Sequence, residues 1–316
     1  MRALLLWVLI VFWAGLLGGC SDQPYAPPAK LGTNLWPGYE PFYLARELGV
    51  LQPSQVHLVE YPSASEVIRG FRNGALDAAA LTLDEVLLLA QNNIPVKVVL
   101  VLDISHGGDV IMARPEIERF EDLAGKRVGV ESNALGAYVI TRALELNGMS
   151  LADMRIERIA VSGHEEAYRE GRVDAVVTFE PVRTALARDG AREIFSSQAI
   201  PGEIVDVLVV HEDYLKRHRD RVAAMADSWF EALAYIRAQR PEAHRLIAER
   251  LKLTPAEVSA SYEGLILADR QENRRQLSGE HPMLGGVLKK LNRAMLDNRL
   301  LHRQVDTSGL ISDQML

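Results

Sequence analysis

The chain has 316 residues, which is room for about two domains. Hydrophobic residues make up 48% and charged residues 24%, and the mean hydropathy of −0.01 excludes a polytopic membrane protein. The formal net charge is −7 and no long basic run occurs, which argues against sequence-independent nucleic-acid binding. The single cysteine, Cys20, excludes an internal disulfide and a multi-cysteine zinc site.

The start of the chain has the pattern of a bacterial secretion signal. Arg2 precedes an uncharged apolar run over residues 3–17, which is short for a membrane-spanning helix. The run ends in Leu17-Gly18-Gly19-Cys20, which resembles a lipobox, where a lipidated cysteine becomes the new N-terminus. We predict a lipoprotein signal peptide over 1–19, with an ordinary signal peptide or a membrane anchor as the alternative. The polar, proline-rich residues 20–30 are predicted to form a tether.

Beyond the tether, short apolar runs alternate with segments of helical periodicity. Gly49 and Gly74 mark the ends of two of the helices. Strands separated by helices indicate βαβ units and a parallel sheet. Strands are predicted at 31–35, 56–60, 78–81 and 96–102, and helices at 41–48, 64–73 and 83–91.

A second cycle of the same kind follows. The stretches 72–78 and 169–175 share a helix stop, a glycine and an Asp-Ala pair, which favours two similarly built α/β lobes over a chance match. A strand at 204–210 precedes a helical remainder, which we expect to cover the first lobe. Strands of this second cycle are predicted at 127–130, 155–159, 175–179 and 193–195, and its helices at 134–147, 164–170 and 182–188.

Four stretches, in this order and spacing, resemble a known family. They are 35–45, 103–113, 122–131, and 177–181 with 201–210 downstream. Together they resemble the type II periplasmic substrate-binding proteins of ABC importers. The most similar group is the one that binds nitrate, sulfonates and taurine, which is related to the binders of thiamine-pyrimidine precursors. The resemblance spans residues 31–273.

The resemblance implies an α/β fold of periplasmic binding protein type II, with two α/β lobes around a ligand cleft and two hinge crossovers. Lobe 1 would comprise 31–109 plus 206–316, and lobe 2 would comprise 110–205. The crossovers are expected near Gly107-Gly108 and near 202–206, since glycine tolerates the backbone changes of a hinge. Such a protein closes around a small solute.

Candidate ligand contacts follow the predicted strands, because α/β proteins bind ligands beyond the carboxyl ends of their strands. Aromatic rings offer apolar contact with a polar handle, or else cap the core. The hydroxyl of Thr82 could bind a ligand and also cap a helix. Asp103, at the crossover, could bind a ligand or fix the hinge. A helix start after residue 130 favours an anion, although Glu131 would repel one. The candidates are Trp36, Tyr39, Thr82, Asp103, Ser105, Glu131, Ser132, Asn133, Glu180 and Asp206.

Four carboxylates bear on the ligand class. If Asp103, Glu131, Glu180 and Asp206 all face the cleft, the cleft is acidic and favours an amine-bearing or zwitterionic solute over a simple anion such as a sulfonate. The alternative is that some of them pair with basic side chains or backbone N–H groups. The eight histidines form no HxH or HxxxH pair backed by acids, so we expect no metal, and we expect no other cofactor.

Function follows from the resemblance and from missing catalytic motifs. There is no GxSxG, Walker loop or thiol for a cysteine mechanism, and the cysteine-rich motif of the pyrimidine-synthase relatives is absent, so we predict that this is not an enzyme. We predict a monomeric periplasmic receptor, held to a bacterial membrane only by the lipid on Cys20. It would deliver a small-molecule ligand to an inner-membrane ABC permease. The alternative is a sensory binding protein that signals to a membrane receptor kinase or cyclase.

Overall fold

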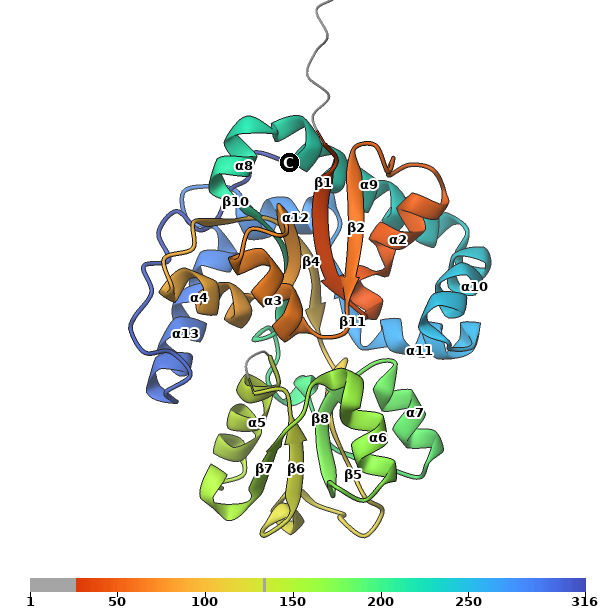
Figure 1. Cartoon of the computed structure of the whole chain (residues 1–316), viewed down its shortest axis with the longest axis vertical. Helices are drawn as coiled ribbons and strands as arrows, with labels where there is room; N and C mark the ends of the chain where they lie inside the picture. The colour runs from red at the N-terminus through yellow and green to blue at the C-terminus, as the bar shows by residue number, and fades with distance from the viewer. Residues whose placement is uncertain (1–26, 133–134) are drawn as a thin grey trace, which may run out of the picture.

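The computed structural model describes residues 27–132 and 135–316, in which the chain forms two β-sheets (Figure 1). Each sheet has its own helices, and the two halves lie end to end along the long axis of the molecule. The predicted signal peptide, Cys20 and Asn133 lie outside the described residues, as does most of the tether. None of the described helices combines the length and the apolarity that a membrane crossing needs.

The larger sheet has six strands in the order β11-β4-β10-β3-β1-β2. Its parallel part follows from the alternation of apolar runs and helices, with β1 pairing with both β2 and β3. β10 is antiparallel and lies between β3 and β4, so a segment far downstream completes the middle of the sheet. The strands are β1 (Ala29–Asn34), β2 (Val56–Tyr61), β3 (Ala78–Thr82), β4 (Val96–Ser105), β10 (Val205–His211) and β11 (Leu265–Leu267).

The helices of the larger half come from both ends of the described chain (Figure 1). Trp229 of α9 is fully buried and packs on Phe42 of α2, with ring centroids 5.1 Å apart. The C-terminal helices therefore contribute to the core of the larger half. The elements are η1 (Pro37–Tyr39), α2 (Glu40–Glu47), α3 (Ala64–Arg72), α4 (Leu83–Gln91), α8 (Glu212–Arg217), α9 (Arg219–Ala238), α10 (Arg240–Leu251), α11 (Pro255–Glu263), α12 (Arg270–Leu277) and α13 (Met283–Asp297).

The smaller sheet has five strands in the order β7-β6-β8-β5-β9. β6 is parallel to β7 and β8, whereas β5 is antiparallel to β8 and β9. The elements are β5 (Asp109–Ala113), η2 (Phe120–Leu123), β6 (Arg127–Val130), α5 (Leu135–Leu146), η3 (Leu151–Asp153), β7 (Arg155–Arg158), η4 (Val161–Gly163), α6 (His164–Arg169), β8 (Ala175–Phe179), α7 (Val182–Arg188), β9 (Arg192–Ser196) and η5 (Ser197–Ala199).

Two connections join the sheets. Residues 106–108 lead from β4 to β5, and residues 197–204, which include η5, lead from β9 to β10. Ser197 ties the two connections together: its Oγ accepts the N–H of Gly107 at 2.6 Å and lies 2.8 Å from Oγ of Ser105. The two chain crossings are therefore a single hydrogen-bonded unit.

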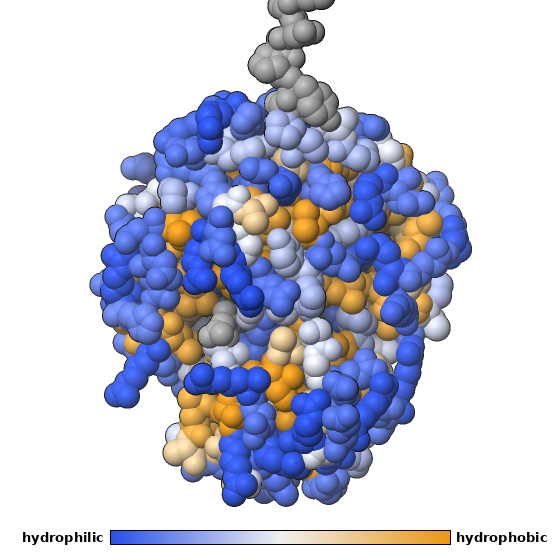
Figure 2. Space-filling view, in the orientation of Figure 1, coloured by the Kyte–Doolittle hydropathy of each residue, from blue (hydrophilic) through white to orange (hydrophobic). Residues whose placement is uncertain are grey.

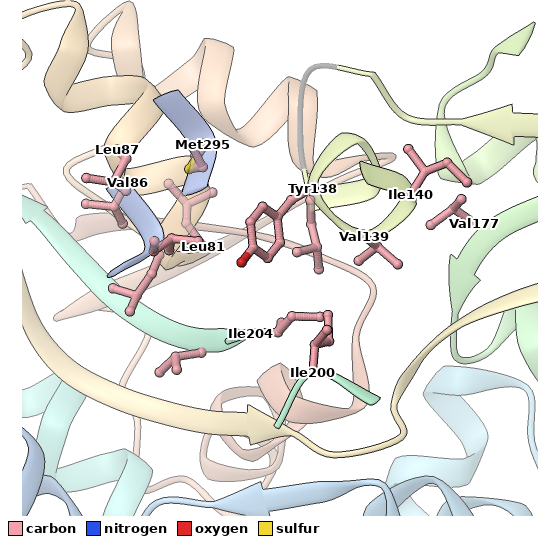
Figure 3. Packing of buried hydrophobic residues seen from close by; sticks show 14 of the residues in the cluster. Leu81, Val86, Leu87, Tyr138, Val139, Ile140, Val177, Ile200, Ile204 and Met295 are labelled. Atoms are coloured by element: carbon pink, nitrogen blue, oxygen red, sulfur yellow. The ribbon is translucent and has the colours of Figure 1, made fainter. Parts of the chain in front are cut away.

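Apolar packing is continuous between the two halves (Figure 3). Leu81 of β3 and Val86 of α4 belong to the same buried cluster as Tyr138 of α5, and Ile200 and Ile204 of the second connection belong to it as well. The halves are thus packed against each other in this conformation. Hydrophilic side chains cover most of the face shown in Figure 2, with apolar patches near the boundary between the halves.

Several boundaries differ from those predicted. β1 begins at Ala29, within the range assigned to the tether, because Ala29 is buried and its N–H donates to the carbonyl of Gln55. β4 extends to Ser105, beyond the predicted end at residue 102. The sequence also does not predict β5 and β11, because each is a short strand stabilised by partners far away in the chain.

Candidate functional site

A cavity lies between the two sheets. The space open to the centre of a water molecule is about 30 Å³. Since one water needs about 10–15 Å³ by this measure, the cavity holds about two waters and the halves are nearly closed around it. Its lining comes from both halves: Asn34, Trp36, Tyr39, Ala64, Thr82, Glu85 and Asp206 on one side, and Asp109, Glu131, Leu135, Gly136, Val139, Val161, His164, Val177, Thr178 and Phe179 on the other.

Two aromatic rings meet across the cavity. Trp36, which follows β1, contacts Phe179 at the end of β8 edge-to-face, with ring centroids 5.3 Å apart and an interplanar angle of 85°. The indole Nε1–H of Trp36 donates to Oδ2 of Asp103 at 3.2 Å. Gly38 leaves room for this pair, because a Cβ there would lie 2.0 Å from Oδ2 of Asp103 and 2.3 Å from Nε1 of Trp36. The pair fixes the indole against the cavity.

The register of β10 brings acidic side chains beside this aromatic pair. Asp206 pairs with Thr82 of β3 on one side and with Asp103 of β4 on the other. The hydroxyl of Tyr39 donates to Oδ1 of Asp206 at 2.5 Å. Burial, followed by the charge of Asp103, raises the pKa of Asp206 well above its usual range, and burial raises the pKa of Tyr39, which keeps its proton.

Two more carboxylates line the cavity beside β3 and β5. Glu85 is in the first turn of α4, where its Oε2 accepts the N–H of Thr82 at 3.0 Å. Burial, followed by the charge of Asp84, raises the pKa of Glu85. Asp109 is the first residue of β5, and burial raises its pKa to about 7. Both side chains are thus costly to ionise in this buried site.

Glu131 and His164 form the wall that the smaller sheet contributes. Oε1 of Glu131 accepts the N–H of Ser65 in the larger half at 2.9 Å, and Oε2 accepts the N–H of Val161 at 3.4 Å. The Nε2 of His164 lies 3.0 Å from the carbonyl of Ile159. Burial lowers the pKa of this imidazole, so His164 is neutral at physiological pH.

The cavity is acidic and incompletely hydrogen-bonded. Among the described residues no Lys or Arg lines it, whereas Glu85, Asp109, Glu131 and Asp206 do. Some of the lining residues also have buried polar atoms with no partner in the described chain, and such atoms in a native fold call for an explanation such as a bound water, ion or ligand. They are Thr82 Oγ1, Asp109 Oδ2, His164 Nδ1 and Thr178 Oγ1. The described residues contain no group of three or more His, Cys, Asp or Glu arranged to hold a metal.

Comparison with known proteins gives the family. The model of the NMT1-like family matches residues 22–252. The chain belongs to the NMT1-like family. It is 23% identical to the taurine-binding periplasmic protein of Escherichia coli over 177 residues, which span 55% of this chain and 55% of that relative. The match thus covers about half the length of both proteins.

Solved structures give the fold of this NMT1-like protein. The alkanesulfonate-binding protein SsuA from Xanthomonas axonopodis pv. citri, bound to MOPS, superposes with a TM-score of 0.76 at 18% identity and covers 91% of this chain and 99% of that one. The periplasmic aliphatic sulphonate binding protein SsuA from Escherichia coli gives a TM-score of 0.72 at 17% identity, covering 89% and 96%. The fold is therefore the predicted α/β fold of type II periplasmic binding proteins.

The structure brings half of the candidate site residues together at the cavity. Trp36, Tyr39, Thr82, Glu131 and Asp206 all line it, from both halves of the NMT1-like fold. Their contacts with a ligand stay predictions.

The other candidates lie around the cavity or away from it. Asp103 lies behind Trp36, and Ser105 contacts Ser197 in the hinge. Ser132 lines an outer groove. Glu180 turns away, because it accepts the N–H and the hydroxyl of Thr184 in α7 at 3.0 and 2.9 Å. Of the four carboxylates considered from the sequence, Glu131 and Asp206 line the cavity and Asp103 and Glu180 do not, whereas Glu85 and Asp109 line it as well.

Sequence reasoning missed polar residues from both halves. Glu85 belongs to a Thr-x-x-Glu capping box at a helix start. Because this local role accounts for the residue, the sequence does not indicate that Glu85 also lines the cavity. Asp109 follows Gly107-Gly108, and only the crossover directs it into the cavity. The full set missed is Asn34, Glu85, Asp109, His164 and Thr178.

Proposed function

We propose that this protein is the solute-binding component of an ABC importer and that its solute carries an amine, alone or as part of a zwitterion. One observation carries the ligand class: Glu85, Asp109, Glu131 and Asp206 line a buried cavity to which the described chain contributes no Lys or Arg. An ammonium group supplies the missing positive charge and donates hydrogen bonds to oxygens such as Asp109 Oδ2. The relatives support the importer role, since one is a taurine-binding periplasmic protein.

The cavity suits an ammonium group for a second reason. The edge-to-face pair of Trp36 and Phe179 presents an aromatic surface beside the carboxylates. Aromatic faces attract cations, most strongly when the cation has lost its water. A simple sulfonate gains neither interaction, and in this cavity it would add a negative charge to an acidic lining. Taurine itself carries both an amine and a sulfonate, so a taurine-like zwitterion fits the proposal.

The proposed mechanism is a shift between open and closed halves. The solute enters while the cleft is open, and its contacts with both halves favour the closed form. The inner-membrane permease recognises that form, with Cys20 lipidated to keep a monomeric receptor at a bacterial membrane. In the alternative, a membrane kinase or cyclase recognises the closed form. Deletion of the gene distinguishes the two roles, because a transport role requires that solute uptake is then lost and a sensing role does not.

The ligand class is tested by thermal denaturation with taurine, ethylamine and ethanesulfonate, which carry both groups, the amine alone and the sulfonate alone. At 100 times its Kd, a ligand adds about 2.7 kcal/mol of stability. We expect a rise in Tm with at least one of the two amines and none with ethanesulfonate. Asp206→Asn should abolish the rise, whereas Glu242→Gln, in a surface ion pair with Arg245, should not. A rise with ethanesulfonate alone would contradict the proposal.

A further inference from the structure

Two helices begin at the cleft, and each receives a carboxylate from the opposite half. Glu131 follows β6 in the smaller half, and its Oε1 accepts the N–H of Ser65 in the first turn of α3, in the larger half, at 2.9 Å. Glu85 belongs to the larger half, and its Oε1 accepts the N–H of Leu135, the first residue of α5 in the smaller half, at 3.3 Å. We call Glu85 and Glu131 the exchanged carboxylates.

Each exchanged carboxylate is also held by its own half. The second oxygen of Glu85 accepts the N–H of Thr82 at 3.0 Å, and that of Glu131 accepts the N–H of Val161 at 3.4 Å. The exposed fractions of Glu85 and Glu131 are only 2% and 7%. Both carboxylates therefore have fixed positions and little freedom to move aside for another anion.

The first N–H groups of a helix lack partners within the helix and carry partial positive charge. Such a helix start is a ready binding site for a sulfonate, a sulfate or a carboxylate. At this cleft the starts of α3 and α5 already hold carboxyl groups of the protein itself. An incoming anion would have to displace a buried carboxylate or lie next to it without a counter-charge.

We propose that Glu85 and Glu131 are specificity-determining residues, which occupy the two helix starts and so exclude solutes whose only charged group is an anion. This inference rests on the proposed function in one respect, namely that the solute binds in the cavity. It gives a physical reason why the cavity would select an amine-bearing solute over a simple anion. The starts of α3 and α5 already hold carboxyl groups of the chain and offer no site to a second anion, whereas the carboxyl oxygens of Asp109 and Asp206 remain in the cavity to accept hydrogen bonds from a cation.

The test removes one exchanged carboxylate and asks whether an anion site appears. Glu131→Ala frees the N–H of Ser65 and the space of the carboxylate, whereas Glu85 also caps its own helix and is left intact. The matched control is Glu145→Ala. Glu145 likewise reaches across the halves, accepting from Asn298 at 2.6 Å, but it is 40% exposed and at no helix start.

Sodium ethanesulfonate is titrated calorimetrically into the full chain and each variant. We expect Glu131→Ala to bind it at least tenfold more tightly than the wild type does, and Glu145→Ala to behave as the wild type. An equal affinity in Glu131→Ala and the wild type, or an equal gain in Glu145→Ala, overturns the inference.

A second variant keeps the test decisive if Glu131→Ala does not fold by near-ultraviolet circular dichroism. Glu131→Gln preserves the length of the side chain and removes its charge, and a gain in the same direction is expected, whereas a folded Glu131→Gln without any gain overturns the inference. Since the probe is an anion alone, these results are independent of whether any amine binds. Failure of the amine screen with a tenfold gain here would reject the proposed solute and leave the role of Glu131 in place.

Discussion

Asp109→Asn should stabilise the unliganded protein while it weakens binding of the amine. Asp109 is 3% exposed, its backbone N–H donates to Oγ of Ser105 at 3.2 Å, and its Oδ2 has no partner in the part of the chain that is described. Burial is the main cause that raises its pKa from 3.8 to about 7. Asparagine has nearly the same shape and no charge, so the substitution isolates the cost of the buried carboxylate.

The magnitude follows from the pKa values of the two states. The pKa of Asp109 is 3.8 in the unfolded chain and about 7 in the folded protein. Between these two pH values, Asp109 is ionised in the unfolded chain and protonated in the folded protein. The contribution of Asp109 to the free energy of unfolding is therefore fully present below pH 3.8 and is lost as the pH rises to about 7. At about 1.4 kcal/mol per pKa unit, the loss reaches about 4 kcal/mol at pH 8.

Urea unfolding at pH 4 and pH 8 measures this effect. We expect the unliganded Asp109→Asn protein to exceed the wild type in free energy of unfolding by up to about 4 kcal/mol at pH 8 and by less than about 1 kcal/mol at pH 4. Affinity for the amine should fall at least tenfold. Asp174→Asn is a control of opposite sign, because the hydrogen bond from Arg127 lowers the pKa of Asp174 and the loss of that carboxylate destabilises most at pH 8. An equal effect of Asp109→Asn at both pH values would refute the reasoning.

Three further substitutions test other contacts. Trp36→Phe keeps a ring against Phe179 but leaves the buried Asp103 without its indole donor, so urea unfolding should show a loss of about 1–3 kcal/mol and calorimetry a weaker amine affinity. Arg250→Met leaves Glu40, which is 1% exposed, without its ion pair, and thermal and urea unfolding should show a loss of about 3–5 kcal/mol. Cys20→Ala should abolish labelling by a fatty-acid probe, and persistent labelling would contradict the predicted lipid anchor.

Periodicity and helix stops predicted the parts of the fold that are local in sequence. The alternation of apolar runs and helices predicted β1, β2, β3 and β4 along the chain, because each apolar run must be buried and each glycine stop ends a helix. The insertion of β10 between β3 and β4 is different in kind. It depends on the chain returning from the smaller sheet, and no local pattern near Asp206 specifies Thr82 and Asp103 as its neighbours.

The site was predictable to a similar degree. Trp36 follows β1, where the fold class places ligand contacts, and Asp206 lies near the start of β10, the strand that returns from the smaller sheet. Glu180 likewise follows a strand but satisfies both oxygens on Thr184, four residues later, so a local contact removes it from the cavity. From the sequence, Glu131 conflicts with the helix start that follows it, because the helix start favours an anion and the carboxylate would repel one. Only the closed arrangement of the halves shows that this carboxylate binds the start of a different helix.

Fold and ligand chemistry are separable in this protein. Its backbone superposes on an alkanesulfonate-binding protein with a TM-score of 0.76, yet only 18% of the residues are identical, and a few side chains decide what a cleft can hold. A bare sulfonate beside Glu85, Asp109, Glu131 and Asp206 would be a buried negative charge, with no Lys or Arg among the described lining residues to compensate it. Placing an ammonium there pairs the same carboxylates and compensates their desolvation. The proposed preference for an amine therefore rests on the side chains that line the cleft, and the shared fold supplies only the cleft itself.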